Sequence, residues 1–281
     1  MFNFWVVSAL VFGISRFLLK TGALDVALAD GMAICSCLPT SIGMVMTLTI
    51  NGKGDEAAAV FHSAFGSIIG VFLTPVMIFW YLGDQGTVNL LTVVWQLVLR
   101  VFVPLIFGQF LRFFYRPVRP FLTKYKNRLN KYSEWALVFI VYTVFCKTFI
   151  ARGKATISEI FLMVAVISLN LVLLMLLSWG LLRVFFHGQP KLQVMGLFGC
   201  THKTIAMGIP LINALYPSSP LVGLYTLPIV VWYPMQLFLG SLITPRLAAY
   251  VGREEARISA QNLEAINSAE HILATQAVTE P

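Results

Sequence analysis

Long apolar stretches, separated by short polar ones, occupy nearly the whole chain. A helix needs about 20 mainly apolar residues to cross the hydrocarbon core of a bilayer, and eight segments reach or approach that length. We therefore predict an all-α polytopic membrane protein. Its membrane-spanning helices are expected at residues 4–19, 27–50, 57–82, 88–114, 133–150, 157–186, 192–215 and 221–250.

The composition also indicates a protein surrounded by lipid. Hydrophobic residues make up 58% of the chain and charged residues 11%, whereas about 25% of a typical soluble domain is charged. The net charge of +8 could suggest nucleic acid. However, the positive residues lie mostly between apolar segments, where they orient spans against the anionic cytoplasmic leaflet. Membrane lipids are therefore expected partners, and nucleic acid is not.

The loop between the fourth and fifth predicted spans sets the orientation. Its basic residues are Arg112, Arg116, Arg119, Lys124, Lys126, Arg128 and Lys131. No acidic residue lies among them, so the positive-inside rule places this loop, and with it both termini, in the cytoplasm. After the last span, residues 251–281 are predicted to form a polar cytoplasmic tail with a short amphipathic helix at 256–274.

Two short motifs occur twice in the same order. Cys37–Met44 and Cys200–Met207 both read Cys, three variable residues, Ser or Thr, Ile, a small residue and Met. Downstream, Gly70–Pro75 is matched by Gly240–Pro245, since both end in Thr-Pro. The copies lie in spans two and three and again in spans seven and eight, and a shift of five spans makes them antiparallel. The sequence thus predicts an inverted repeat, which is typical of secondary transporters.

The two repeat units differ in length. The second unit, residues 88–250, contains five predicted spans, whereas the first unit, residues 1–82, contains three. We expect an ancestral five-plus-five architecture whose first two spans are missing from this chain, through a truncated gene model or a natural deletion. Together the two units form one transmembrane transporter domain, residues 1–250.

A proline lies beside each copy of the first motif. Pro39 is inside the first copy and Pro210 follows the second. Each proline removes a backbone donor and disfavours a regular helix through that point. A single proline in a membrane helix commonly produces only a kink. Two prolines next to a duplicated motif instead favour two broken helices, whose unwound backbone lines a buried site.

Lys203 is the most informative polar residue because it lies midway along the apolar segment 192–215. A lysine at the centre of a membrane helix costs about 2.5–3.5 kcal/mol on insertion scales. One interpretation is an anion or proton site in which Thr201 and Thr204 supply hydroxyls. The alternative is a side chain that extends to the membrane interface. His202, next to this cation, is expected to stay neutral, with pH sensing as a weaker alternative.

The other polar residues within predicted spans carry weaker signals. Ser63 and Ser67 share a face of the third span, where small hydroxyls more often permit close helix packing than bind ions. Gln236 is a single intramembrane amide. The four cysteines are expected to pack as small apolar residues. The sequence contains no metal-binding, cofactor-binding or catalytic motif, so enzymatic activity is not expected.

Several stretches of the chain resemble a known family. They are Cys37–Ser41, Gly54–Ser67, Leu73–Pro75, Cys200–Lys203 and Gly208–Pro210. Together they are similar to the bile acid:sodium symporter family, and more narrowly to the orphan seventh-member branch of solute carrier family 10, up to about residue 250. The resemblance implies ten spans in an inverted five-plus-five arrangement. It also implies that two broken helices, around Pro39–Met44 and Thr201–Ile209, cross at the site.

The resemblance bears on sodium binding as well. Ser63 corresponds to a hydroxyl sodium ligand of the wider family. That family has a Ser-Asn pair where this chain has Gly43-Met44, and a glutamate and a glutamine where it has Ala206 and Pro210. Without that carboxylate, and with Lys203 in the same segment, tight sodium binding is disfavoured. The candidate substrate-binding or ion-binding residues are therefore Pro39, Thr40, Ser41, Ser63, Thr201, His202, Lys203, Thr204 and Gln236.

The resulting hypothesis is a carrier for an unidentified organic or anionic solute that is not classically sodium-coupled and that influences intracellular calcium. The calcium role is implied by the seventh-member branch, which is associated with restraining calcium entry. The alternative is a regulatory membrane protein that acts on a calcium channel or pump and transports nothing; an inert fragment is a third reading. The resemblance points to the plasma membrane or a secretory-pathway membrane (Golgi or ER), and the oligomeric state stays open.

Overall fold

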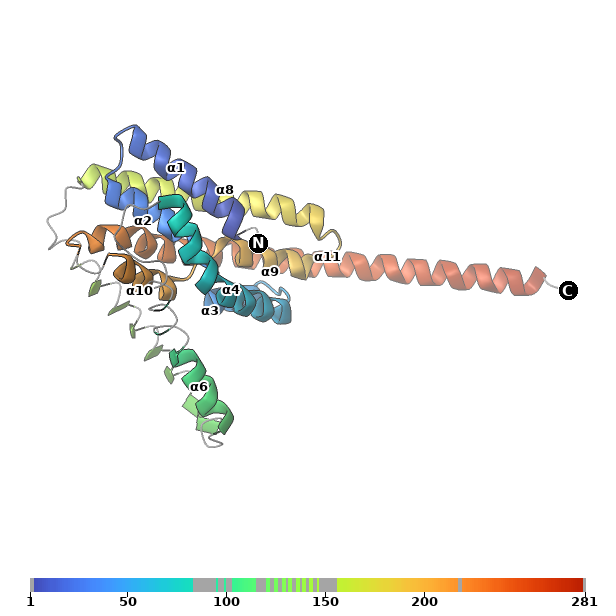
Figure 1. Ribbon diagram of the computed structural model, residues 1–281. Coiled ribbons are helices and arrows are strands. Elements are labelled where there is room, and N and C mark those ends of the chain that lie inside the picture. Colours follow the sequence, from blue (N-terminus) through green and yellow to red (C-terminus); the bar gives the residue numbers. More distant parts are fainter. Residues whose placement is uncertain are drawn as a thin grey trace.

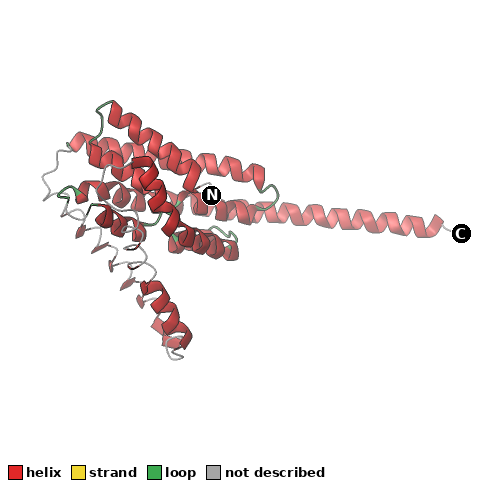
Figure 2. Cartoon of the chain, in the orientation of Figure 1, coloured by secondary structure: helices red, strands yellow, loops and turns green. Residues whose placement is uncertain are grey.

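The computed structural model describes residues 3–82, 103–114, 156–216 and 219–279, with isolated positions between 95 and 146. Every named element in these ranges is a helix, and the helices are joined by turns and loops (Figure 2). The elements are η1 (Asn3–Val7), α1 (Ser8–Lys20), α2 (Val26–Cys37), α3 (Ile42–Asn51), α4 (Glu56–Leu82), α6 (Val103–Phe114), α8 (Ile157–Phe185), α9 (Pro190–Thr201), α10 (Ile205–Leu215) and α11 (Val222–Thr279). The prediction of an all-α protein is confirmed for the described part of the chain.

Most predicted spans correspond to these helices. Span 4–19 is η1 followed by α1, span 57–82 is α4, and span 157–186 is α8. Spans 27–50 and 192–215 are each divided into two shorter helices, α2 with α3 and α9 with α10. α6 covers the second half of span 88–114. Most of span 133–150, and most of the basic loop before it, lies outside the described residues.

α2 forms the centre of the helical assembly. Every residue from Ala27 to Cys37 is buried, and α2 packs against α1, α4, α10 and α11 (Figure 1). A helix that is apolar all round belongs in an interior, and α2 has no polar face to direct at solvent. The first half of the interrupted span 27–50 is therefore held from several sides.

Three of the described helices are long and apolar enough to cross a membrane. They comprise Glu56–Tyr81, Ile157–Phe185 and the first part of α11, Val222–Glu264. On α8, apolar side chains such as Phe161 and Leu176 are about two-thirds exposed. An exposed apolar surface of this kind is stable when lipid covers it, which fits an integral membrane protein.

α11 continues well beyond its predicted span. The sequence places a boundary near residue 250, with a separate tail helix at 256–274, but one helix runs from Val222 to Thr279. Its C-terminal half projects from the other helices (Figure 1). No proline lies between Pro245 and the end of the helix at Thr279, and the segment is rich in Ala, Glu, Gln and Arg, which are strong helix formers. Nothing in the sequence ends the helix at the boundary.

Candidate functional site

The first interruption, between α2 and α3, follows directly from Pro39. A residue that precedes proline is pushed out of the helical region, and Leu38 is extended, with φ −68° and ψ 146°. Pro39 itself has no backbone N–H to continue the ladder. Ser41 is also extended, with ψ 112°, and α3 begins at Ile42. The predicted break at Pro39 is thus present and has a local cause.

The second interruption, between α9 and α10, has a different cause. The extended residues are His202, with ψ 121°, and Thr204, with ψ 129°, and neither is next to a proline. The prediction that Pro210 breaks this span is wrong, because Pro210 lies inside α10, five residues after its start. Thr204 begins α10 as its N-cap, and its Oγ1 accepts a hydrogen bond from the N–H of Ala206 at 3.3 Å.

The two interruptions meet and pair. Thr40 and Lys203 form an antiparallel β-bridge. The N–H of Ser41 donates to the carbonyl of His202 at 3.3 Å, and the N–H of Thr204 donates to the carbonyl of Pro39 at 3.0 Å. Backbone groups that the broken helices leave unpaired are thereby satisfied within the protein, as a membrane interior requires. The expected crossing of the two segments is observed, over Leu38–Ser41 and His202–Thr204.

The crossing joins residues at equivalent positions of the duplicated motif. Aligning Cys37 with Cys200 places Thr40 opposite Lys203, and these two residues are the bridge partners. The same alignment relates Ser41 to Thr204 and Pro39 to His202. It therefore converts the hydrogen bond from Ser41 N–H to His202 O into the one from Thr204 N–H to Pro39 O. It also relates Ser36 to Gly199, and each of these carbonyls accepts from the side chain of the other segment: Thr40 Oγ1 donates to Gly199 O at 3.1 Å, and Lys203 Nζ to Ser36 O at 2.7 Å.

Lys203 is buried in this crossing. The residue is 2% exposed. Its Nζ donates to the carbonyl of Leu38 at 3.0 Å as well as to that of Ser36. The alternative in which Lys203 extends to the interface is therefore wrong. Its ammonium group reaches across the crossing to the C-terminal end of α2, where exposed carbonyls favour a cation.

Gln236, on α11, fixes the backbone of Lys203. The N–H of Lys203 donates to Gln236 Oε1 at 2.7 Å, and Gln236 Nε2 donates to the carbonyl of Lys203, also at 2.7 Å. Trp232 Nε1 donates to the same Oε1 at 3.0 Å, which sets the orientation of the amide. The side chain thus supplies a donor and an acceptor to an extended residue, and this tertiary contact stabilises the second interruption without a proline.

His202 and Thr201 share a hydrogen-bond chain. His202 Nε2 lies 3.1 Å from the carbonyl of Gln236 and must donate to it, while Nδ1 lies 2.9 Å from Thr201 Oγ1. Thr201 Oγ1 is also 2.7 Å from the carbonyl of Leu197. Thr201 Oγ1 donates to Leu197 O, and because a hydroxyl has a single proton, the same proton is the one that His202 Nδ1 would otherwise receive.

Ser63 differs from the other candidates. It lies on α4 and is fully buried, but its Oγ has no hydrogen-bond partner within the part of the chain that the structure describes. Ser67, one turn later, donates to the carbonyl of Thr40 at 3.4 Å and so contacts the crossing. Of the predicted site residues, the crossing brings together Pro39, Thr40, Ser41, Thr201, His202, Lys203, Thr204 and Gln236.

The glycines of the second motif have a matching role in the two halves. A Cβ at Gly70 would lie 2.5 Å from Cβ of Pro39, and a Cβ at Gly240 would lie 2.9 Å from Nε2 of His202. Pro39 and His202 are equivalent in the first motif. Each glycine therefore lets a long helix approach one of the two interruptions, and Gly240 also gives room to Cδ1 of Leu48, which would lie 2.7 Å from a Cβ there. The threonines diverge: Thr74 donates to Cys37 O at 2.8 Å, and Thr244 to its own helix at Gly240 O.

One ion pair with a buried carboxylate was not predicted from the sequence. Arg16 Nη2 of α1 lies 3.4 Å from Asp30 Oδ1 of α2, and the carboxylate is 8% exposed. The guanidinium also lies over the ring of Phe12, 5.1 Å from its centre. Opposite charges in two consecutive apolar segments are a signal for such a pair, because each is costly in a membrane unless it finds a partner.

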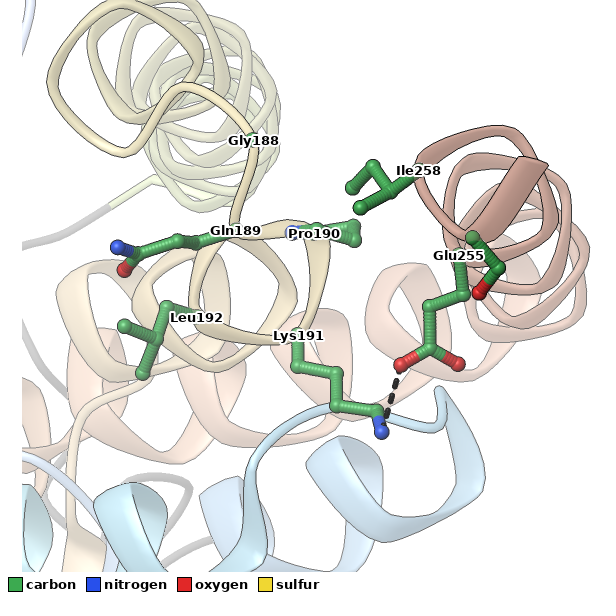
Figure 3. Close-up of a pocket in the computed structure, with 8 residues that line it drawn as sticks. Gly188, Gln189, Pro190, Lys191, Leu192, Glu255 and Ile258 are labelled. Carbon is green, nitrogen blue, oxygen red and sulfur yellow. Dashed lines mark ion pairs between the residues drawn. The ribbon is translucent and has the colours of Figure 1, made fainter. Parts of the chain in front are cut away.

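The surface carries a separate pocket of about 610 Å³ between the start of α9 and α11 (Figure 3). Lys191 and Glu255 form an ion pair at 2.6 Å on its wall, and both side chains are about half exposed. The hydrogen bond with Glu255 raises the pKa of Lys191 above its usual value. The carbonyl of Lys191 also accepts from the N–H of Asp55. The pocket shares no residue with the crossing.

Sequence comparisons relate this chain to known proteins. Residues 1–249 match the SBF-like CPA transporter family. Sodium/bile acid cotransporter 7 of Rattus norvegicus is 31% identical over 240 residues, which cover 83% of this chain and 68% of the rat protein. The Danio rerio protein of that name is 29% identical over 238 residues, 83% of this chain and 69% of its own length. An uncharacterized Pseudomonas aeruginosa protein is 28% identical over 225 residues, 78% and 65% of the two chains.

Proposed function

Because the chain belongs to the SBF-like CPA transporter family, and is thus an integral membrane protein of a transporter family, we propose that it carries an organic or anionic solute through an inverted-repeat fold. The crossing of the two interrupted segments is its substrate site. In such carriers the solute and coupling ions bind near the midplane, where broken helices from the two repeats meet.

The observation that carries this proposal is the interchange of hydrogen bonds at the bridge. One bond runs from Ser41 N–H to His202 O and the other from Thr204 N–H to Pro39 O. When the two copies of the motif are exchanged, each bond takes the place of the other. A pseudo-two-fold axis between Thr40 and Lys203 accounts for both bonds at once. Inverted repeats related by such an axis support alternating access, in which one unit moves against the other around a fixed site.

Sodium coupling of the usual kind does not fit the residues at the crossing. The relatives from rat and zebrafish are named as sodium/bile acid cotransporters. In this chain Gly43, Met44, Ala206 and Pro210 stand where the wider family is expected to have side-chain sodium ligands. Lys203 adds a cation at the same crossing. Two cations in one site of low dielectric repel each other strongly, so we propose transport without classical sodium coupling.

The physiological effect we propose is a lowering of calcium entry into the cytosol. A different class of function would produce the same effect: a membrane protein that binds a calcium channel or pump and transports nothing. The projecting C-terminal half of α11 favours this second candidate (Figure 1), because polar residues on it, such as Arg257, Gln261 and Glu264, are exposed and available to a partner. The two candidates differ in whether the crossing is needed.

The test is the cytosolic calcium rise after calcium readdition in cells that lack their own homologue. The cells receive empty vector, the wild-type chain, Lys203→Met, or Lys191→Met, which removes a half-exposed lysine far from the crossing. Equal membrane expression is verified for each. We expect the wild type and Lys191→Met to lower the rise and Lys203→Met not to. If Lys203→Met lowers it equally, the regulatory protein is the better account; if none does, the calcium role is wrong.

A further inference from the structure

We propose that the ammonium group of Lys203 is a built-in cation that occupies a monovalent-cation site at the C-terminal end of α2. The inference rests on the proposed function in one respect: it explains why a member of this transporter family does without external sodium at the crossing. Removal of the Lys203 side chain should therefore leave a site that a small cation from solution can fill.

The site is formed by backbone carbonyls at a helix end. The last carbonyls of a helix lack intrahelical donors and carry partial negative charge. At the end of α2, Ser36 O and Leu38 O both accept from Lys203 Nζ, at 2.7 and 3.0 Å. Carbonyl oxygens at the ends of half-helices are the groups that coordinate sodium in carriers with broken helices. The ammonium thus takes the place that such an ion has elsewhere.

The hydroxyl groups that also contact this helix end within the described residues are neutral. Ser36 O also accepts from the hydroxyl of Ser8 at 2.7 Å, and Cys37 O accepts from the hydroxyl of Thr74. The ionisable side chains that interact electrostatically with Lys203 are the thiols of Cys35, Cys37 and Cys200, and no carboxylate is among them in the described part of the chain. The carbonyl dipoles at the end of α2 stabilise the ammonium.

The equivalent end of α9 shows what the same place looks like without a cation. Gly199 O, the counterpart of Ser36 O, accepts from Thr40 Oγ1 at 3.1 Å and contacts His62 Nε2 at 3.3 Å. These partners are a hydroxyl and an imidazole, and neither is an ammonium group. Equivalent carbonyls therefore have different partners: Ser36 O accepts from the ammonium of Lys203, and Gly199 O accepts from the hydroxyl of Thr40 and contacts the imidazole of His62. Only the α2 end should gain a cation requirement when its partner side chain is removed.

The experiment measures thermal unfolding of the purified full chain, wild type and Lys203→Ala, in chloride salts of sodium, potassium, methylammonium or choline at equal ionic strength. Choline is too large for the space that the Lys203 side chain leaves. We expect the wild type to melt at the same temperature in all four salts. Lys203→Ala should melt several degrees lower in choline and regain much of the loss, in a saturable way, in sodium or methylammonium.

Two matched variants control for general destabilisation. Thr40→Ala removes the donor at the equivalent position, and Lys191→Ala removes a lysine at the surface. Neither should show a difference between choline and the small cations. If Lys203→Ala does not survive purification, Lys203→Thr takes its place, since threonine is the residue that the other half uses at this position and is short enough to leave room for an ion.

The inference is overturned if Lys203→Ala melts at the same temperature in choline and in every small cation. It is also overturned if the wild type gains as much from sodium as the variant does. The readout is stability, so it is independent of transport. If small cations rescue Lys203→Ala but Lys203→Met keeps the calcium effect, the cation site is upheld and the proposed function is contradicted. If small cations do not rescue Lys203→Ala but Lys203→Met loses the calcium effect, the proposed function is upheld and the cation site is contradicted.

Discussion

Thr40 and Lys203 face each other across the crossing, and each donates its side chain to a carbonyl at the end of the other segment's half-helix. Both positions follow their motif cysteine by three residues. The backbone arrangement is the same for the two, but one side chain is a neutral hydroxyl and the other an ammonium. Two equivalent positions of the repeated motif therefore carry different charges, and we expect specificity to depend on the ammonium of Lys203.

Gln236 is expected to be essential to the second interruption. Gln236→Leu keeps the volume but removes the two hydrogen bonds that Gln236 makes with the buried N–H and carbonyl of Lys203, and the loss of a partner costs a buried polar group about 1–3 kcal/mol. We predict a loss of about 2–4 kcal/mol in the free energy of unfolding, measured by denaturant or thermal unfolding in detergent. Gln261→Leu, at an exposed position of α11, is the control, and equal stability of the two variants would contradict the role of Gln236.

Gly31 permits the close approach of α2 and α11. A Cβ at this position would overlap the carbonyl oxygen of Tyr225, and backbone cannot move aside as a flexible side chain can. Gly31→Ala should cost about 1–3 kcal/mol, as overpacking does, and lower the unfolding temperature. Gly13→Ala on α1 has no atom within 4 Å of the new Cβ and should be neutral or stabilising, because alanine favours helix. Similar melting of the two variants would refute the close packing.

The Arg16–Asp30 pair should contribute as a coupled unit. Asp30 is almost buried, so Asp30→Asn leaves Arg16 without its counter-charge, and Arg16→Gln does the same to the carboxylate. A double-mutant cycle over unfolding free energies should give a coupling of about 1–2 kcal/mol. Additive single effects would mean that the two charges are held independently.

The Lys191–Glu255 pair lies at the surface and should matter little. Exposed ion pairs are screened by water and salt, so Lys191→Ala should have the same melting temperature as the wild type at pH 7. Glu255 raises the pKa of Lys191 in the folded state. Any stabilisation is therefore fully present below the ordinary lysine pKa and is lost as pH rises through the raised value. Melting curves of both proteins between pH 7 and strongly alkaline pH check this, and a difference that grows with pH would contradict it.

The sequence predicted features that have a local cause. Pro39 forces Leu38 out of the helix, so the first break follows from two adjacent residues. The second break depends on Gln236, some 30 residues away in the chain, and no local signal marks it; Pro210 was the wrong guide, because α10 accommodates it. The burial of Lys203 likewise depends on carbonyls of another segment, and so does the pairing of Asp30 with Arg16.

The account depends most on the contact between positions 40 and 203, and a disulfide cross-link tests it directly. The backbone hydrogen bonds flank Thr40 and Lys203, running from Ser41 N–H to His202 O and from Thr204 N–H to Pro39 O. Thr40 and Lys203 are therefore a non-hydrogen-bonded antiparallel pair, whose Cα atoms lie about 4.5 Å apart. A disulfide can span that distance. The measurement uses Thr40→Cys with Lys203→Cys, in a background whose four native cysteines are replaced by alanine.

Oxidation in native membranes should cross-link this pair. After the chain is cleaved between the two positions, the disulfide keeps the two fragments together as one band on a gel, and reduction separates them. Ile50→Cys with Lys203→Cys is the control pair, and it should not cross-link. Ile50 lies near the far end of α3, eight residues after the first residue of that helix, which is about 12 Å along the helix axis. Cross-linking of positions 40 and 203 but not of 50 and 203 is the predicted result. No cross-link at 40 and 203, in a protein that reaches the membrane intact, would contradict the crossing and the site built on it.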